Sequence, residues 1–292
     1  MEFRGKTAFI TGGASGIGLA LAERCAAEGM KLLIADIEEG ALSAAAQGLR
    51  AQGAEVATYR LDVSDLDQYK AVAAAVLAEH GAPFLLVNNA GVAWKAPASA
   101  ATPEDWRWTI SVNVLGLGYG ISLFVPAMIA SGQKGAVLNT ASVTGLICSP
   151  GTSAVYSASK HAVLAISETL AHELRAHGMH VAALCPGSVA TNITEADRNA
   201  PAGIAKGLTS AEPAEREFTR SFVGNGISAK SVADQAFDAL AEGRFYVITH
   251  PEYREEIETR HRQIEAAVRG EPASDVGLLA LAKQLLNLQP LT

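Results

Sequence analysis

Seven short apolar segments alternate with helical patterns along most of this chain, and this alternation limits the fold more than any other feature. The segments lie near residues 6–11, 31–36, 55–61, 83–88, 134–141, 179–185 and 245–249. Each is rich in apolar or β-branched residues, as expected of strands that are buried on both faces. The pattern predicts an α/β fold in which helices cover both faces of a parallel sheet of about seven strands.

The composition agrees with one large domain. The chain has 292 residues, of which 49% are hydrophobic, and this is enough to fill a substantial core. Its net charge is −7 and its basic residues are scattered, so no nucleic-acid partner is expected. The histidines show no metal-ligand spacing, and we expect them at the surface or in capping hydrogen bonds, with no metal site.

Cysteine usage and the first residues predict a cytoplasmic location. Cys25, Cys148 and Cys185 are an odd number at spacings that suit no disulfide framework, which indicates a reducing compartment. The start of the chain has neither a basic segment nor a long apolar one, so no secretion signal is expected. Cys25 is predicted to be buried in a helix, and Cys148 either lines a pocket or is a small buried side chain.

One apolar stretch, Val112 to Ser131, contains no charged residue and is long enough to span a bilayer. It also holds Asn113 and several glycines and lies among the alternating strands and helices. We therefore predict a buried helix and no membrane association. Gly116, Gly118 and Gly120 permit close approach, either of a second subunit's helix or of the sheet.

The first predicted strand runs directly into a glycine turn. Lys6 to Thr11 is followed by Gly12, Gly16 and Gly18, and then by a helical pattern. Glycines allow positive φ and let the backbone approach a pyrophosphate, while the following helix N-terminus offers free N–H groups. The turn therefore predicts a dinucleotide site, although its Thr-Gly-x-x-x-Gly-x-Gly spacing differs from the usual Gly-x-Gly-x-x-Gly.

A tyrosine and a lysine lie one helical turn apart in Tyr156-Ser-Ala-Ser-Lys160, with Ser142 upstream. Residues four apart share a helix face, so the Lys160 ammonium can lie near the Tyr156 hydroxyl. We therefore predict that Lys160 lowers the pKa of Tyr156 from its ordinary value of about 10. The resulting phenolate could take a proton from an alcohol.

Several motifs, in sequence order, resemble those of the short-chain dehydrogenase/reductase family. They are Thr11-Gly12-x-x-x-Gly16-x-Gly18, Asp62-Val63, Asn88-Asn89-Ala90-Gly91, Asn113 with Ser142, Tyr156-x-x-x-Lys160 and Pro186-Gly187-Ser188-Val189-Ala190-Thr191. The resemblance implies a Rossmann-type doubly wound sheet that forms a catalytic domain over residues 1–250, with a substrate lid at about 190–227. Residues 251–292 are then a helical C-terminal extension, and a homodimer or homotetramer is expected.

The same resemblance assigns roles to particular side chains. Asn113, Ser142, Tyr156 and Lys160 match the family's catalytic tetrad. Tyr156 would be the general acid or base, Lys160 would also hold the nicotinamide ribose, and Ser142 would bind the substrate oxygen. Asn113 would maintain a helix distortion and a proton-carrying water. The residues expected to bind the cofactor are Gly12, Ser15, Gly16, Ile17, Gly18, Asp36, Asp62, Val63, Asn89, Ala90, Gly91, Tyr156, Lys160, Pro186, Gly187, Val189 and Thr191.

Asp36 indicates which dinucleotide is bound. It ends the second predicted strand, where an acid accepts hydrogen bonds from the adenosine ribose and repels a 2′-phosphate. Ser15 stands where NADP-preferring relatives often have a basic residue, and Ile37-Glu38-Glu39 supplies no cation. We therefore predict NAD as the cofactor. The alternative is that Asp36 only caps the next helix.

Three segments are expected to line the substrate pocket, namely residues 92–97, residues 143–153 and the lid with Phe218 and Phe222. They are mostly apolar, Trp94 is the largest side chain of the first, and no arginine cluster offers a handle for a phosphate or carboxylate. The segment Phe245 to Arg254 resembles longer bacterial members, some of which oxidise benzylic secondary alcohols of lignin-derived aryl ethers. The expected substrate is therefore a hydrophobic secondary alcohol or its ketone, with aryl alcohols among the candidates.

These expectations combine into an NAD-dependent oxidoreductase that interconverts such an alcohol and its ketone by hydride transfer. An NADPH-preferring carbonyl reductase is one alternative. A non-catalytic dinucleotide-sensing protein is another, which the presence of both Tyr156 and Lys160 disfavours. The C-terminal extension either covers a neighbouring subunit or packs on its own domain.

Overall fold

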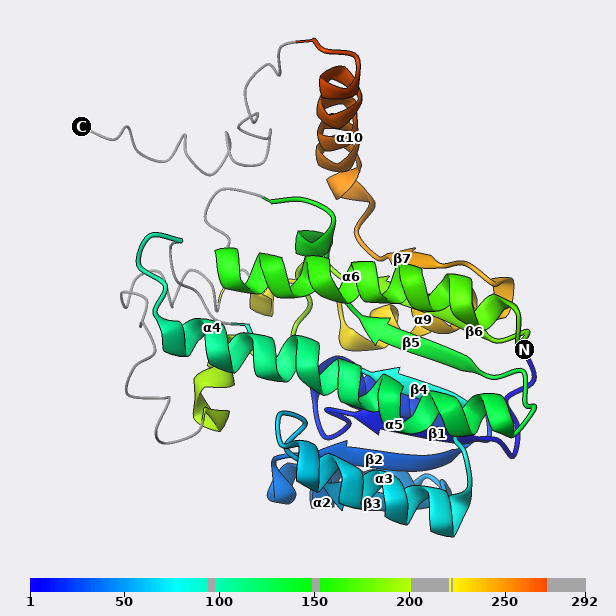
Figure 1. Ribbon diagram of the computed structural model, residues 1–292. Coiled ribbons are helices and arrows are strands. Elements are labelled where there is room, and N and C mark those ends of the chain that lie inside the picture. The colour runs from blue at the N-terminus through cyan, green and yellow to red at the C-terminus, as the bar shows by residue number, and fades with distance from the viewer. Residues whose placement is uncertain (94–97, 149–152, 201–220, 222, 272–292) are drawn as a thin grey trace.

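All seven predicted strands form one parallel sheet. The computed structural model describes residues 1–93, 98–148, 153–200, 221 and 223–271. Within them the strand order is β3-β2-β1-β4-β5-β6-β7 (Figure 1). The strands are β1 (Thr7–Thr11), β2 (Lys31–Asp36), β3 (Val56–Arg60), β4 (Leu85–Asn88), β5 (Ala136–Thr140), β6 (His180–Cys185) and β7 (Tyr246–Ile248). The chain reverses its direction of winding between β1 and β4, so the predicted doubly wound topology is confirmed.

Helices cover both faces of the sheet, as predicted. The longer helices are α1 (Gly16–Ala27), α2 (Glu39–Ala51), α3 (Leu66–His80), α4 (Pro103–Ile110), α5 (Gly116–Ala130), α6 (Ala154–Arg175), α9 (Ala229–Glu242) and α10 (Arg254–Val268). One buried cluster joins α1, α2 and α9 to one face, and the other clusters join α3, α5 and α6 to the opposite face. Figure 1 shows α5 and α6 in front of the sheet and α9 behind it.

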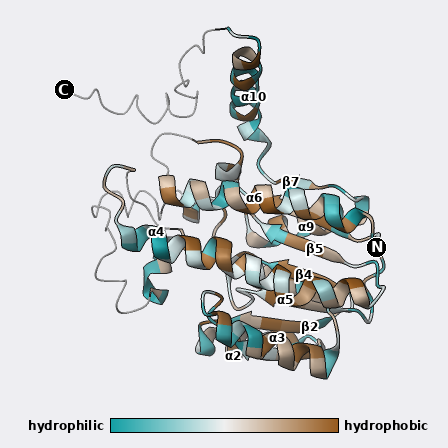
Figure 2. Cartoon of the chain, viewed as in Figure 1, coloured by the Kyte–Doolittle hydropathy of each residue, from teal (hydrophilic) through white to brown (hydrophobic). Residues whose placement is uncertain are grey.

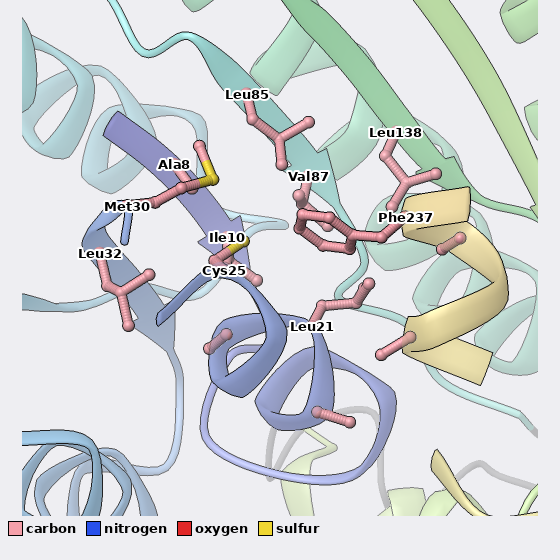
Figure 3. Close-up of a cluster of buried hydrophobic side chains, with 14 of the residues drawn as sticks. Ala8, Ile10, Leu21, Cys25, Met30, Leu32, Leu85, Val87, Leu138 and Phe237 are labelled. Carbon is pink, nitrogen blue, oxygen red and sulfur yellow. The ribbon is translucent and has the colours of Figure 1, made fainter. Parts of the chain in front are cut away.

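The strands form because their side chains are apolar in both directions, and Figure 2 shows them largely in the hydrophobic colour. On β1, Phe9 and Ile10 point to opposite faces. Phe9 packs against Phe124 of α5, with ring centroids 4.6 Å apart. Ile10 belongs to the cluster of α1 and α9, where Leu21 and Phe237 lie beside it (Figure 3). This period of two fixes which residues of each strand meet which layer of helices.

Side-chain caps mark where several helices begin. The Asp65 carboxylate accepts hydrogen bonds from the first turn of α3, and Ser228 caps α9 in the same way. Thr102 and Asp105 form a reciprocal capping box at the start of α4. Ser153 accepts a hydrogen bond from the Tyr156 backbone N–H and so sets the start of the helix that carries the predicted catalytic pair.

A continuous helix runs from Pro103 to Ala130 and includes a π-helical turn at Ser111–Leu115. Among the described residues it alone is long and apolar enough to cross a membrane by length and composition, a test that core helices of soluble proteins also pass. Its α5 part lies against the sheet, with Phe124 and Met128 buried there. The position matches the predicted buried helix.

The three glycines of this helix have different surroundings. A Cβ on Gly116 would lie 2.8 Å from Val63, and one on Gly120 would lie 2.3 Å from Asn88 Oδ1 and 2.7 Å from Tyr69 Oη. A Cβ on Gly118 would meet no atom within 4 Å. Gly116 and Gly120 therefore serve packing inside their own domain, and only Gly118 faces open space.

Two cysteine expectations have different outcomes. Cys25 is buried in α1, as predicted. Cys148 is exposed, so the expectation of a small buried side chain is wrong. It follows the short 3-10 turn after Ser142, where the chain leaves the core.

The C-terminal extension begins with α10, which projects beyond the sheet on the side of α6 (Figure 1). Arg260 of α10 donates hydrogen bonds to the Leu146 carbonyl and, over 2.8 Å, to His161 Nε2 of α6. The described part of the extension therefore contacts its own domain. Residues 272–292, and the predicted lid between 201 and 220, lie outside the described residues.

Two of the three glycines of α5 allow a matched test of the packing. Gly120→Ala should lower the free energy of unfolding by about 1–3 kcal/mol, because its methyl group has no space between α5 and β4. Gly118→Ala should raise it by up to about 1 kcal/mol, because alanine is the better helix former. Urea unfolding of both variants checks the signs. A loss of stability or of oligomeric state in Gly118→Ala would instead show that a partner helix packs on this glycine.

Candidate active site

Parallel pairing brings the C-terminal ends of the strands to one edge of the sheet, and polar side chains gather there. Thr11 ends β1, and its hydroxyl donates to the Val87 carbonyl at 3.3 Å. The same oxygen accepts the backbone N–H groups of Asn89 and Ala90 at 3.0 and 3.1 Å. Thr11 therefore fixes the backbone that follows β4.

Asn89 extends this connection across three strands. Its side-chain nitrogen donates to the carbonyls of Thr11 and Gly12, and its Oδ1 accepts from the Thr140 hydroxyl at 3.2 Å. β1, β4 and β5 are thereby tied together at the edge where the predicted cofactor residues Asn89, Ala90 and Gly91 lie. The backbone carbonyl of the same Thr140 accepts a hydrogen bond from Lys160 Nζ.

The glycine turn has the shape that a pyrophosphate requires. Gly12 and Gly16 have φ of 65° and 53°, in the left-handed region that favours glycine. A Cβ on Gly18 would lie 1.9 Å from the Gly12 carbonyl oxygen, so no other residue fits there. Ser15 makes no side-chain cap at the start of α1, and the first turn contains no acidic residue. The N–H groups of Gly16, Ile17 and Gly18 are thus left to an external anion.

Asp36 links the glycine turn to the following helix. Its carboxylate accepts the Ala14 N–H at 3.0 Å and the Glu38 N–H at 3.1 Å. Burial raises the pKa of this carboxyl above its ordinary value, although both backbone N–H groups act in the opposite direction. Asp36 therefore fixes the backbone just before α2 and the turn on which the phosphates would lie. It does not cap α2, whose N-cap residue is Glu38 and which has no side-chain cap.

An arginine that the sequence did not suggest bonds to Glu38, two residues after Asp36. Arg198, from a 3-10 turn at Ile193–Asn199, donates to Glu38 Oε1 from Nε and Nη2 over 3.0 and 2.6 Å. Asn199 donates to the same oxygen at 2.8 Å, and these bonds lower the pKa of Glu38. The sequence of residues 37–39 supplies no cation, as expected, and Arg198 brings one to Glu38 from a distant part of the chain. The two partners are 160 residues apart, so no local pattern reveals the pair.

Asn113 lies at the centre of the π-helical turn. Its Oδ1 accepts the Val92 N–H at 2.8 Å, and its Nδ2 donates to the Val92 carbonyl at 2.9 Å and to Ser159 Oγ at 3.0 Å. The Asn113 side chain therefore bonds to both the N–H and the carbonyl of Val92, as the backbone of a neighbouring strand would. The predicted helix distortion at Asn113 is present, and it joins α6 to the segment that follows β4.

Ser142 and Tyr156 meet across the end of β5. The Ser142 hydroxyl is hydrogen-bonded to the Tyr156 hydroxyl and also donates to the Pro186 carbonyl at 3.3 Å. Ser142 is buried and Tyr156 is half-buried. The structure thus brings together the two hydroxyls that the resemblance pairs.

Lys160 lies under Tyr156 in the same helix. Its Nζ donates to the Thr140 carbonyl at 2.8 Å and lies 5.7 Å from the centroid of the Tyr156 ring. The side chain is 4% exposed, and burial lowers the pKa of Lys160 to about 8. A Cβ on Gly91 would lie 3.2 Å from Asn113 Oδ1 and 3.5 Å from Lys160 Nζ, so these two predicted catalytic residues meet beside Gly91.

The expected effect of Lys160 on Tyr156 is not what the structure shows. Burial raises the pKa of Tyr156, and the hydrogen bond with Ser142 only partly opposes this effect. The Lys160 ammonium donates to the Thr140 carbonyl. Burial therefore sets the direction of the Tyr156 pKa shift, an effect that helical spacing alone does not reveal.

The remaining predicted cofactor residues border the same edge. The Asp62 carboxylate accepts from the Ser64 N–H and hydroxyl at 2.9 and 2.6 Å, and Val63 is buried against Gly116. In the loop after β6, the Thr191 side chain lies 3.1 Å from a Cβ on Gly16. Three other predicted cofactor residues lie in that loop. The Pro186 carbonyl accepts a hydrogen bond from Ser142, Gly187 contacts His250, and Val189 is buried.

His250 is buried against this loop, whereas a surface or capping position was expected. His250 directly follows the last predicted strand. This is the one sequence feature that could have suggested that it lies near the other site residues. The predicted pocket residues Trp94, Phe218 and Phe222 lie outside the described residues.

Comparisons with known proteins agree on one family. A family model described as short chain dehydrogenase matches residues 6–202. A CLA biosynthesis dehydrogenase/reductase of Lactiplantibacillus plantarum is 34% identical, covering 90% of this chain and 94% of the relative. A C alpha-dehydrogenase of Sphingobium sp. strain NBRC 103272 / SYK-6 is 32% identical, covering 90% and 86%. The crystal structure of a short-chain dehydrogenase/reductase from Burkholderia phymatum in complex with NAD is 41% identical, with a TM-score of 0.86, covering 94% and 98%.

The role of Asn113 in holding this edge can be tested by stability. Asn113→Ala should lower the free energy of unfolding by about 2–4 kcal/mol, because the buried N–H and C=O of Val92 lose their partner. Asn225→Ala, which removes an exposed hydrogen bond to the Ser221 carbonyl, is the matched control and should change it by less than about 1 kcal/mol. Equal effects of the two substitutions in urea unfolding would contradict this role.

Proposed function

This chain belongs to the short-chain dehydrogenase family of oxidoreductases, and from that membership we propose that it is an NAD-dependent dehydrogenase of a hydrophobic secondary alcohol. In the reverse direction it would reduce the corresponding ketone. The observation that carries the proposal is a continuous set of contacts at the edge where the glycine turn also lies. Ser142 bonds to Tyr156, the Tyr156 ring lies near Lys160, and Lys160 and Asn113 meet beside Gly91.

The residues present fit a nicotinamide dinucleotide. The N-terminus of α1, which has no side-chain cap, and the positive φ of Gly12 and Gly16 suit the pyrophosphate, and Asp36 stands where an adenosine ribose would bind. Lys160 and the loop after β6 would hold the nicotinamide half. When bound, this cofactor would accept or supply the hydride.

The side chains of the site divide the proton chemistry between them. Ser142 donates its one proton to the Pro186 carbonyl in the free protein, and on substrate binding it would turn that proton to the substrate oxygen and fix its position. Tyr156 would take the hydroxyl proton during oxidation and return it during reduction. The Lys160 cation lies near enough to stabilise the phenolate once Tyr156 loses its proton. Asn113 would maintain the π-helical turn at Ser111–Leu115 beside these residues.

The charges at the adenosine end support NAD over NADP. The Asp36 carboxylate would repel a 2′-phosphate, whereas the charge of Glu38 is offset by its pairing with Arg198. One observation favours the alternative, an NADPH-preferring carbonyl reductase, because Arg198 brings a guanidinium to the same edge. That cation is already paired with Glu38, however, so its charge is largely neutralised.

The substrate class rests on the mostly apolar sequence of residues 92–97 and 143–153, which contain no arginine. Mostly apolar walls favour a hydrophobic alcohol over a phosphorylated or carboxylated one. The relative from Sphingobium is named a C alpha-dehydrogenase. An aryl secondary alcohol is therefore the first compound class to examine.

Tyr156→Phe tests the proposal directly. It removes the oxygen that transfers the proton and leaves the ring in place, so turnover should fall by at least about a thousandfold. Binding of NADH, followed by its fluorescence, should change by less than about threefold, because the ring still fills its site. Turnover close to that of the unaltered protein would contradict the role of Tyr156.

The direction of catalysis should respond to pH through Tyr156. Alcohol oxidation needs the unprotonated phenol, and burial raises the pKa of this group in the free protein. The value of kcat/KM for oxidation should therefore rise with pH through the alkaline range, and that for ketone reduction should fall over the same range. Initial rates in both directions at constant ionic strength check the signs. Oxidation that is fastest in acid would contradict the assignment.

Glu38→Gln tests the source of cofactor preference. The substitution removes the charge that pairs with Arg198, so the guanidinium becomes available to a 2′-phosphate. The ratio of kcat/KM for NAD to that for NADP should fall by about tenfold. Glu39→Gln removes the same charge one residue later and is the control. If both variants shift the ratio equally, net charge alone sets the preference and Arg198 has no part in it.

A further inference from the structure

The loop that follows β6 is held by a histidine from the far end of the catalytic domain. After β7 the chain returns to the site, and His250 lies against Gly187 and Ser188, only 4% exposed. Its Nδ1 accepts the Gly187 N–H at 3.0 Å, and its Nε2 bonds to the Ser188 carbonyl at 2.9 Å. The Thr249 hydroxyl lies 2.8 Å from the same Nδ1. One ring therefore bonds two successive backbone units of the loop.

These partners select one form of the ring. A backbone N–H can only donate and a carbonyl can only accept, so Nδ1 must carry a lone pair and Nε2 must carry the proton. The ring is thus neutral, with its proton on Nε2. In this form it presents an acceptor and a donor to the loop, as an adjacent strand would.

Packing leaves the loop little freedom on this side. A Cβ on Gly187 would lie 2.8 Å from His250 Cγ and 2.9 Å from the Tyr253 ring. The Ser188 carbonyl also accepts the Ile227 N–H at 3.1 Å, and Val189 pairs with Ile227 in an isolated bridge. His250, Tyr253 and Ile227 therefore enclose the loop from the C-terminal part of the domain.

The opposite side of the loop reaches the catalytic serine. The Pro186 carbonyl accepts from Ser142 Oγ at 3.3 Å and from the Val143 N–H at 3.0 Å. Pro186 and Gly187 are adjacent, so a displacement of the loop at His250 also displaces the acceptor that orients Ser142. The His250 ring and the Ser142 hydroxyl thus hold one short loop from its two sides.

We propose that His250 is a positioning residue, which fixes the Pro186–Ser188 loop for the nicotinamide half of the cofactor and orients Ser142 through the Pro186 carbonyl. For the cofactor this inference rests on the proposed function. The contact of His250 with the loop stands independently of it. Loss of the ring nitrogens should loosen the loop, weaken dinucleotide binding and misplace Ser142, while the remainder of the fold stays intact.

Two substitutions separate hydrogen bonding from packing. His250→Phe keeps a planar ring but removes both nitrogens. His250→Gln keeps an acceptor and a donor on either side of one carbon, as the imidazole does, and should restore the bonds in part. His180→Phe is the control, because it removes a histidine that bonds to the Arg244 carbonyl at the start of β6, far from the loop.

Hydrogen exchange measured by mass spectrometry reports on the bond between His250 and the Gly187 N–H, and it does not require catalytic turnover. In His250→Phe the amide of Gly187 should exchange at least about tenfold faster than in the unaltered protein, since it loses its acceptor. His250→Gln should recover most of this protection, and His180→Phe should leave it unchanged. Unchanged exchange at Gly187 in His250→Phe, or an equal loss in His180→Phe, would overturn the proposal.

Binding and kinetics then test the consequence for the site. His250→Phe should raise the dissociation constant of NADH and the KM for NAD about tenfold and lower kcat several-fold, with partial recovery in His250→Gln. Faster exchange at Gly187 together with unchanged dinucleotide binding would overturn the positioning role. Absence of turnover in the unaltered protein would count against the proposed function alone, because exchange and binding remain measurable. If His250→Phe does not fold, His250→Gln replaces it and is compared with His180→Phe. Faster exchange at Gly187 and weaker NADH binding are then expected in His250→Gln but not in His180→Phe.

Discussion

Parallel pairing of all seven strands is the constraint on which the rest of the structure depends. Because every strand runs in the same direction, each connection must cross a face of the sheet as a helix, and every C-terminal strand end reaches the same edge. The glycine turn after β1, Asp36 after β2, Asn89 after β4, Ser142 after β5 and the Pro186 loop after β6 are thereby placed together. No single segment contains the site.

Polar side chains convert this common edge into a fixed arrangement. Thr11 and Asn89 bond to backbone groups at the ends of β1 and β4, and Asn89 accepts from the Thr140 hydroxyl at the end of β5. The Thr140 carbonyl accepts from the Lys160 ammonium. These groups are buried or half-buried, where an unpaired donor or acceptor costs about 1–3 kcal/mol. Displacing one strand end would therefore leave several groups unpaired, so the edge is rigid before any cofactor arrives.

The sequence predicted the features that depend on local pattern. All seven strands and the glycine turn were placed correctly, since apolar alternation and motif spacing are properties of short segments. The helix distortion at Asn113, which is present, was expected from the family resemblance. It did not reveal the Arg198–Glu38 pair or the burial of His250, because the partners are far apart in the chain. It also misjudged the pKa of Tyr156, since burial depends on the packed neighbours of the ring and not on its distance from Lys160 along a helix.

Reduced-nicotinamide absorbance is the measurement that tests the central claim most directly. The purified protein would be given NAD or NADP in parallel with a panel of aromatic and alicyclic secondary alcohols. An NAD-dependent dehydrogenase of hydrophobic alcohols should produce a steady rise in absorbance with NAD, faster than with NADP, for at least one class of the panel. Tight NAD binding without turnover on any compound would contradict that claim and favour a dinucleotide-sensing protein.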